Sequence, residues 1–168
     1  FGCDFGSYHL KIYHKEQDSC LMQHNMVAVQ DKKEMLAHGD EAYAMYEKAP
    51  ANIQVSSPMS YGNLASISNM QEFLKKLLDC PFKEFHTDQV EQLVITMHGT
   101  DAKVTDCLMY CADYLNIPRE RVHVISHTES FAYYVLSQRK ELWSNQVGLF
   151  ELSEDRLCYY EMKVQRGM

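Results

Sequence analysis

The chain has 168 residues, of which 46% are hydrophobic and 23% are charged, a composition typical of a folded domain or one lobe of a larger protein and unlike that of a disordered chain. Sixteen basic residues against 23 acidic residues give a formal net charge of −7. Because an acidic surface repels phosphate backbones and anionic lipid heads, we expect no nucleic-acid partner and no binding to anionic membranes.

Three short strands are predicted at the start of the chain. Residues 2–5 form the first strand. Residues 8–13 form the second, because apolar and polar side chains alternate there with the period of two that a half-buried strand requires. Residues 20–24 form a third extended segment, which residues 25–29 continue or repeat. We therefore expect the fold to begin with a strand meander.

The hydrophobic pattern weakens in residues 31–67, which form an excursion from the regular fold. A short helix is predicted there from about Asp40, which can serve as the N-cap, to Glu47. Residues 52–56 are expected to be extended, and a turn region follows over residues 58–63.

Helices and strands alternate after this excursion. A helix is predicted to start at Ser68 with a Ser-x-x-Gln capping box and to continue with apolar residues at helical spacing. Residues 92–97 are an almost unbroken apolar run, which predicts a central strand covered on both faces. Helical spacing resumes after a cap at Thr100 or Asp101 and ends before Pro118.

The last third of the chain adds a strand, a helix and a hairpin. A strand is predicted over residues 122–125 and a helix over residues 128–142. Residues 147–152 and 157–164 are strand-like runs around a polar turn, which predicts a hairpin. The whole order predicts an α/β fold in which helices flank a mixed sheet.

The sequence shows no feature that places the chain in a membrane or an oxidising compartment. No apolar run approaches the roughly 20 residues of a membrane-spanning helix, and residues 1–6 lack the pattern of a signal peptide. The six cysteines lie mostly in apolar segments without the close spacing of disulfide-rich domains, so we interpret them as reduced thiols. We expect a cytoplasmic protein without direct membrane insertion.

The first candidate for a binding site is the sequence Asp4-Phe5-Gly6-Ser7, an acid at a strand end followed by a small turn. Gly6 lets the backbone approach a phosphate group, Ser7 adds a hydroxyl, and Asp4 can hold a hydrated Mg²⁺. A tight hairpin uses the same residue types, so the motif alone leaves both interpretations open.

Several further motifs follow at characteristic spacings. They are Met26-Val-Ala-Val-Gln-Asp-Lys-Lys, Met35-Leu-Ala-His-Gly-Asp-Glu-Ala, Ala49-Pro-Ala-Asn-Ile, Ser57-Pro-Met-Ser-Tyr-Gly-Asn-Leu-Ala, Leu93-Val-Ile-Thr-Met and Val124-Ile-Ser-His-Thr-Glu-Ser-Phe-Ala. Together with Asp4-Phe5-Gly6-Ser7, this series resembles the first domain of the actin and heat-shock-chaperone ATPase superfamily, and within it the MreB-type actin homologues of bacteria. The resemblance covers nearly all of the chain.

The resemblance implies an RNase H-like core that carries a small inserted subdomain. Residues 1–30 and 68–146 would form the core, residues 31–67 the inserted subdomain, and residues 147–168 a hairpin that begins a second domain. In this superfamily ATP binds between two domains, so the chain alone would not be a competent ATPase.

The resemblance also assigns roles to individual residues. Asp4 would be the acid that holds the metal through water, Gly6 and Ser7 would belong to the first phosphate loop, and Glu129 would be the catalytic acid that helps to position the attacking water. An acid in the first turn of a helix is also favoured by the helix dipole, so Glu129 has a purely structural interpretation as well. We interpret His127 as an ordinary residue at a strand end.

The second phosphate loop departs from the superfamily pattern. That loop normally reads Asp, an apolar residue and consecutive glycines, whereas this chain has Glu151-Leu152-Ser153-Glu154-Asp155-Arg156 and no glycine. Glycines allow backbone N–H groups to reach the γ-phosphate, and added carboxylates repel it. We therefore expect impaired ATP hydrolysis, weak or absent nucleotide binding and no bound cofactor.

Three functional hypotheses follow. The leading one is a catalytically degenerate pseudo-ATPase that acts as an assembly or interaction scaffold, through self-association or protein partners. The second is an ATPase that binds Mg-ATP with a non-standard second loop, in which Ser153 and Arg156 contact phosphate. The third is an RNase H-like metal-dependent nuclease, which would need acids such as Asp4, Asp101 and Glu129 to converge on metal ions.

Overall fold

The structure is a computed structural model and describes residues 1–60, 63–64, 75–76, 78–79, 83, 85, 90–99, 101–142, 146–153 and 156–163. The helix predicted from Ser68 lies largely outside these residues, although residues 75–76 and 78–79 are helical. None of the helices in the described ranges combines the length and apolar character that a membrane-crossing helix needs.

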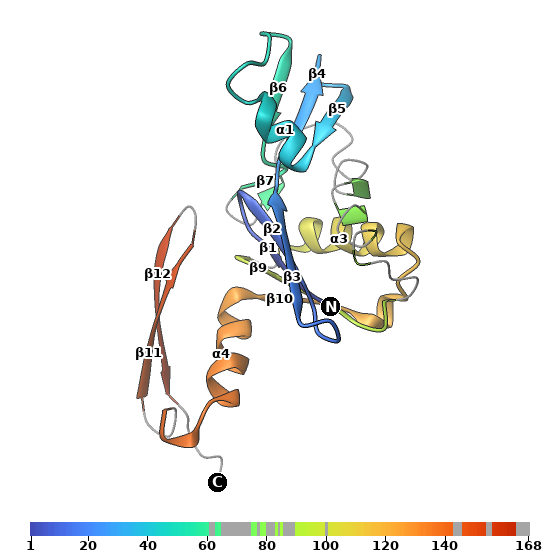
Figure 1. Cartoon of the computed structure of the whole chain (residues 1–168). Helices are drawn as coiled ribbons and strands as arrows, with labels where there is room; N and C mark the ends of the chain where they lie inside the picture. Colours follow the sequence, from blue (N-terminus) through green and yellow to red (C-terminus); the bar gives the residue numbers. More distant parts are fainter. Residues whose placement is uncertain are drawn as a thin grey trace.

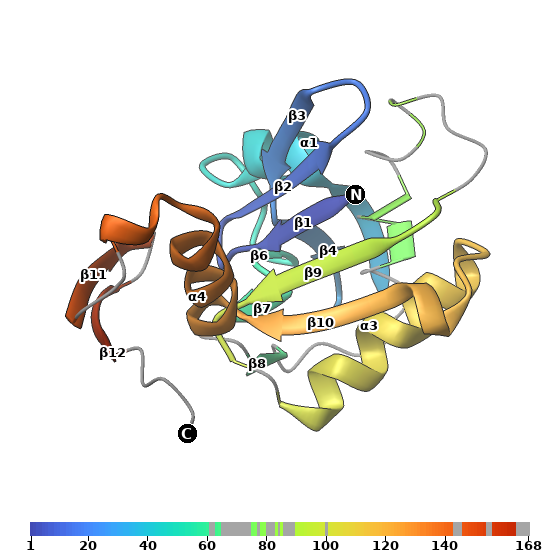
Figure 2. The ribbon, with the colours of Figure 1, turned by 90° about the horizontal axis from the view of Figure 1, so that it is seen from below.

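A five-stranded mixed sheet organises the fold (Figure 2). Its strands are β1 (Gly2–Phe5), β2 (His9–His14), β3 (Ser19–His24), β9 (Leu93–Met97) and β10 (Val122–Ser126), in the order β10-β9-β1-β2-β3. The first three strands form the predicted antiparallel meander. β1, β9 and β10 run parallel, and β9 is an internal strand as its apolar sequence predicts.

The main core lies between this sheet and α3 (Ala102–Tyr114). Leu10 and Ile12 of β2 are buried with their polar neighbours facing outward, as the alternating pattern requires. Ile95 of β9 and Leu108 of α3 are fully buried in the same cluster. The described cysteines are all free thiols: Cys3, Cys20, Cys107, Cys111 and Cys158.

Both ends of α3 follow from local chemistry. Asp101 is the N-cap, because its side chain accepts a 2.9 Å hydrogen bond from the backbone N–H of Lys103. The helix ends before Asn116, which has φ +58°, a left-handed conformation that asparagine tolerates well. A short 3₁₀ turn, η1 (Arg119–Arg121), then leads into β10.

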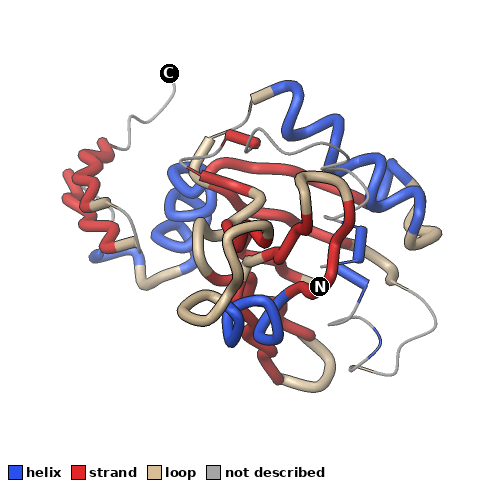
Figure 3. The backbone as a smooth tube through the Cα atoms, turned by 90° about the horizontal axis from the view of Figure 1, so that it is seen from above, coloured by secondary structure: helices blue, strands red, loops and turns tan. Residues whose placement is uncertain are grey.

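The last helix and the hairpin extend away from the main sheet. α4 (His127–Ser137) starts directly after β10 and ends earlier than the predicted residue 142; a 3₁₀ turn, η2 (Lys140–Leu142), follows. β11 (Gln146–Leu152) and β12 (Leu157–Lys163) then pair as the predicted antiparallel hairpin. Figures 1 and 3 show this hairpin beside α4 and separate from the five-stranded sheet.

A second, smaller sheet sits at the other end of the molecule (Figure 1). It contains β4 (Val27–Gln30), β5 (Glu34–His38) and β6 (Ile53–Ser56), with β4 in the middle, and α1 (Gly39–Met45) packs on it. Buried residues of these elements form a cluster of their own, namely Met26, Ala28, Ala37 and Ala42. The small two-stranded pair β7 (Met59–Ser60) and β8 (Asn63–Leu64) follows.

The prediction for residues 25–29 was wrong. Residues 25–29 do not continue the first meander, because β4 pairs with β5 and β6, so the small sheet begins before residue 31. Asn25 redirects the chain: its side-chain amide donates to the carbonyl oxygen of Gly6 at 2.7 Å, and its backbone N–H donates to that of Tyr8 at 2.6 Å. The division into a core of residues 1–30 and 68–146, an inserted subdomain of residues 31–67 and a hairpin of residues 147–168 stays a prediction.

The N-cap of α1 is His38, so the prediction that Asp40 caps this helix was wrong. Asp40 instead joins α1 to β3. Its Oδ1 accepts a 2.9 Å hydrogen bond from the backbone N–H of His24 and lies 2.6 Å from His24 Nδ1. The His24 ring also stacks on Tyr43 of α1, with 3.8 Å between ring centroids. These hydrogen bonds, the backbone one first, lower the pKa of Asp40 below its ordinary value.

Replacing Asp40 by asparagine should remove a small, pH-dependent contribution to stability. Because the folded-state pKa is lowered, the carboxylate stabilises the fold above its unfolded pKa of about 3.9, and this contribution is lost as pH falls through the folded pKa. The side chain is 69% exposed, so solvent screening limits the effect to about 0.2–1 kcal/mol.

Urea unfolding at neutral pH and at about pH 3 measures this contribution. The stability advantage of the wild-type protein over Asp40→Asn should be largest at neutral pH and should shrink at the lower pH, as pH falls toward the lowered pKa of Asp40. Glu41→Gln, which changes an exposed acid in the same helical turn, is the matched control. A difference of the same size at both pH values would contradict the assigned role of Asp40.

Candidate functional site

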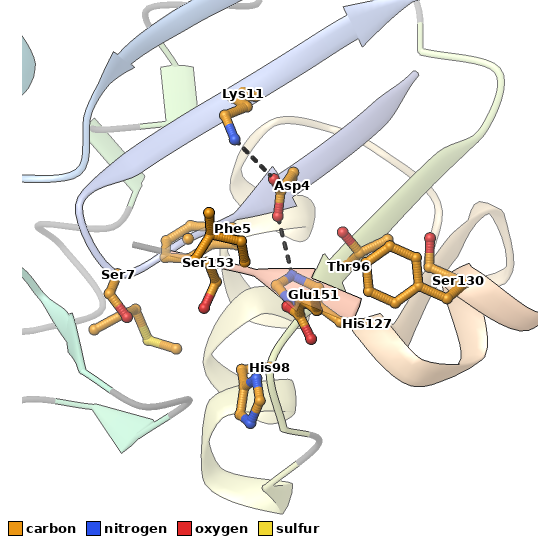
Figure 4. A pocket seen from close by; sticks show the side chains of 14 residues that line it. Asp4, Phe5, Ser7, Lys11, Thr96, His98, His127, Ser130, Glu151 and Ser153 are labelled. Carbon is orange, nitrogen blue, oxygen red and sulfur yellow. Dashed lines mark hydrogen bonds and ion pairs between the residues drawn. The ribbon is translucent and has the colours of Figure 1, made fainter. Parts of the chain in front are cut away.

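A cavity of about 350 Å³ lies where the parallel strands of the main sheet end. Asp4 comes from the end of β1, and Thr96 and His98 come from the end of β9 and the residue after it. His127 is the first residue of α4, directly after β10 (Figure 4). Ligands of α/β proteins often bind at the carboxyl ends of parallel strands, so this cavity is the candidate site.

The turn between β1 and β2 forms one wall of the cavity. Gly6 and Ser7 both line it, so the structure places the predicted first phosphate loop beside Asp4. The Gly6 backbone N–H donates a 3.0 Å hydrogen bond to the carbonyl oxygen of His9. That N–H therefore closes the turn between the two strands.

His127 lies between two carboxylates. Its Nε2 is 3.0 Å from Asp4 Oδ1, and its Nδ1 is 2.7 Å from Glu151 Oε1. Lys11 contacts the other Asp4 oxygen at 3.3 Å, and the Tyr160 hydroxyl donates to Glu151 Oε2 at 2.7 Å. The imidazole and the Glu151 side chain are 14% and 6% exposed. A partly buried polar network thus connects β1, α4 and the β11–β12 hairpin.

The network shifts the pKa values of His127, Asp4 and Tyr160. Burial opposes the charged form of His127, but the hydrogen bonds and charges of Asp4 and Glu151 outweigh it, so the pKa of His127 is raised. Burial likewise opposes the Asp4 carboxylate, but His127 and Lys11 outweigh it and the pKa of Asp4 is lowered. Burial and the bond to Glu151 raise the pKa of Tyr160 to about 12. The arrangement therefore favours a charged pair of Asp4 and His127.

The end of β11 and the residue after it also line the cavity, as Glu151, Leu152 and Ser153. Ser153 lines the cavity, but its backbone N–H donates to the carbonyl oxygen of Arg156 at 3.0 Å and its hydroxyl lies 3.2 Å from the same oxygen. Arg156 is not among the residues that line the cavity. Glu154 and Asp155 lie outside the described residues.

Glu129 does not join the site. It is exposed on α4, where its backbone N–H donates to Ser126 Oγ at 3.1 Å and its carboxylate accepts a long 3.4 Å contact from the Tyr133 hydroxyl. Asp101 caps α3. Within the described part of the chain, the one group of three or more potential metal ligands contains neither Glu129 nor Asp101. Among the described residues, Asp4, Asp101 and Glu129 do not converge, so the structure gives the nuclease hypothesis no support.

Sequence reasoning missed the centre of the network. His127, interpreted as an ordinary strand-end residue, contacts Asp4 and Glu151, which are 123 and 24 residues away in the chain. One signal was available: Asp4, His98 and His127 each stand at the carboxyl end of a predicted strand. Had those strands been recognised as parallel neighbours, the three side chains would have been expected at one edge of the sheet.

Several solved structures have a fold similar to that of this chain. The chain is similar to MreB5 of Spiroplasma citri bound to ADP, with a TM-score of 0.65 and 18% identity over 97% of this chain and 51% of that chain. The structure of the same protein bound to AMPPNP has a TM-score of 0.65 and 17% identity, with the same coverage of both chains. MamK in a double helical filament has a TM-score of 0.59 and 17% identity, over 88% of this chain and 45% of the MamK chain.

These similarities confirm the actin-like, MreB-type fold that the sequence predicted. The chain spans about half the length of these solved structures. No curated protein has a significantly similar sequence. Residues 13–168 match a family of unknown function, in the part described as DUF5716 C-terminal. With nearly the whole chain matched, this protein belongs to the DUF5716 C-terminal family and has an actin-like fold.

Proposed function

We propose that this chain is part of a catalytically degenerate actin-like protein, which acts as an assembly or interaction scaffold and does not hydrolyse ATP. The observation that supports this proposal best is the position of His127. Its imidazole occupies the space between Asp4 and Glu151, at the edge of the sheet where the superfamily holds metal and phosphate groups.

The residues around the cavity fit Mg-ATP poorly. A hydrated Mg²⁺ needs free carboxylate oxygens, but one Asp4 oxygen faces His127 and the other faces Lys11. Phosphate groups need free backbone donors, but the N–H groups of Gly6 and Ser153 are both used within their own turns. Glu129, the expected catalytic acid, is exposed on α4 and is not among the residues that line the cavity. We therefore derive no catalytic step through Mg-ATP.

The scaffold role is supported by an exposed apolar face on the hairpin. Phe150, Leu152, Leu157 and Tyr159 are 58–84% exposed, and they occupy directly paired positions of the two strands. Contiguous apolar surface of this kind marks protein contacts. MamK, which has a similar fold, assembles into a double helical filament, so self-association is a reasonable role for this surface.

A working ATPase is the alternative, and one observation favours it. Asp4, Gly6, Ser7 and Ser153 all line the cavity, and the superfamily resemblance assigns them to its two phosphate loops. MreB5, with a similar fold, has been solved with both ADP and AMPPNP. In this alternative, Ser153 and Arg156 would turn toward phosphate when Mg-ATP binds.

Calorimetric titration of the full-length protein with Mg-ATP separates the two functions. We expect no binding heat and no phosphate release, both for the wild type and for Asp4→Ala. Sedimentation velocity should detect concentration-dependent assembly without nucleotide. Micromolar Mg-ATP binding that Asp4→Ala abolishes, or assembly that occurs only with ATP, would reject the degenerate site, and phosphate release that Asp4→Ala abolishes would establish the ATPase.

A further inference from the structure

We propose that His98, His127 and Glu151 form a binding site for a divalent transition metal, with Zn²⁺ as the representative ion. Each of the three side chains offers one ligand atom, and these atoms all lie within 4.8 Å of one another. They come from the ends of β9 and β10 and from β11, so the main fold and the hairpin both contribute. Figure 4 shows the three side chains facing one part of the cavity.

The ligand set has the composition of an open zinc site. Two imidazole nitrogens and one carboxylate oxygen bind zinc at about 2.0–2.2 Å, which places neighbouring ligand atoms about 3.4 Å apart in a tetrahedron. Small side-chain rotations would bring the three atoms from within 4.8 Å to this separation. The fourth position would face the cavity of about 350 Å³, which has room for water or a small oxygen ligand.

The surrounding contacts orient each ligand for this role. His127 Nε2 is held by Asp4 at 3.0 Å, which leaves Nδ1 on the side of Glu151. A carboxylate on the non-ligating nitrogen is the usual partner of a metal-bound histidine. Glu151 Oε2 accepts from the Tyr160 hydroxyl at 2.7 Å, which leaves Oε1 for the ion. The metal would replace the proton that Nδ1 and Oε1 share, and that proton would pass to solvent.

The chemistry of the donors selects the class of ion. Mg²⁺ and Ca²⁺ prefer an all-oxygen shell, whereas two imidazoles favour Zn²⁺, Co²⁺ or Ni²⁺. This inference goes beyond the proposed scaffold function and does not depend on it. The site would connect α4 and the sheet edge to the hairpin through a single ion.

The test is titration of chelator-stripped full-length protein with Zn²⁺ by calorimetry and with Co²⁺ by visible absorption. We expect one ion per chain, with d–d bands of a nitrogen and oxygen shell and no thiolate-to-cobalt charge-transfer band. His98→Ala and His127→Ala should each weaken binding by more than about 100-fold, beyond the usual effect of losing a supporting partner. Asp4→Asn should weaken it by about 10–100-fold.

His123→Ala is the matched control, because His123 is an exposed histidine on the same strand that leads to His127. It should bind Zn²⁺ and Co²⁺ as the wild type does. His98→Ala leaves the contacts of His127 with Asp4 and Glu151 in place, so it tests the site even if His127→Ala fails to fold. Zn²⁺ affinity that is unchanged in His98→Ala, or a Co²⁺ spectrum dominated by thiolate bands, would overturn the proposal. Neither result bears on Mg-ATP binding.

Discussion

Leu108→Ala should lower the free energy of unfolding by about 2–5 kcal/mol, the usual cost of truncating a fully buried leucine. Leu108 has 0% of its surface exposed and lies on the face of α3 that packs against the main sheet. The change removes buried methyl groups and leaves a cavity that the strands cannot close, because β9 is fixed between β1 and β10. Urea unfolding followed by circular dichroism measures the loss.

Leu136→Ala is the matched control for this prediction. Leu136 is also a helical leucine, but it lies on α4 and is 47% exposed. The two substitutions change helix propensity equally, so the difference between them isolates burial. We expect a loss below about 1 kcal/mol at Leu136. Similar losses at both positions would show that α3 does not pack on the sheet as described.

Glu151→Ala should lower the free energy of unfolding by about 3 kcal/mol, the lower end of the range for breaking a buried ion pair. The substitution leaves His127 Nδ1 and the Tyr160 hydroxyl without their carboxylate partner; the imidazole is only 14% exposed, and Tyr160 is half-buried. Asp4 still holds the other nitrogen of His127, which keeps the cost from being higher. Urea unfolding in chelator-treated buffer measures the effect without any contribution from metal.

Glu161→Ala provides the comparison, because Glu161 is an exposed acid on β12 of the same hairpin. We expect a change within about 0.5 kcal/mol there. If both variants lose the same stability, then the carboxylate of Glu151 does not anchor the hairpin to the core. A loss specific to Glu151 would show that the Asp4–His127–Glu151 network is formed in solution.

The sequence predicted those elements whose pattern is local. The alternation in β2, the apolar run of β9, the cap and stripe of α3 and the two runs of the hairpin each contain their own signal, and the structure has all of them within a few residues of the predicted bounds. The small sheet was harder, because β5 has no clear alternation and the partner of β4 is set by Asn25 and its contacts with the first turn. Pairing of this kind depends on tertiary contacts that a local pattern does not contain.

The same contrast between local patterns and tertiary contacts explains which residues of the cavity the sequence could indicate. Asp4, Gly6 and Ser7 are neighbours in sequence, so their motif could be recognised, and they do line the cavity with Ser153. His98 and His127 were not recognised, because a single histidine at a strand end has no distinctive spacing. The two histidines can be recognised as neighbours of Asp4 only once β1, β9 and β10 are known to pair in parallel, because this pairing places the three strand ends together.

The parallel pairing of β1 with β9 has a consequence for how the protein matures on the ribosome. Gly2 pairs with Val94 and Cys3 with Ile95, so the pair closes a loop of roughly 90 residues, which costs about 2 kcal/mol more entropy than closing a ten-residue loop. While the intervening chain is being translated, the apolar face of the first meander has no partner. A nascent chain stalled before β9 should therefore be a strong client for chaperones, and release should follow synthesis of β10, which completes the sheet after α3.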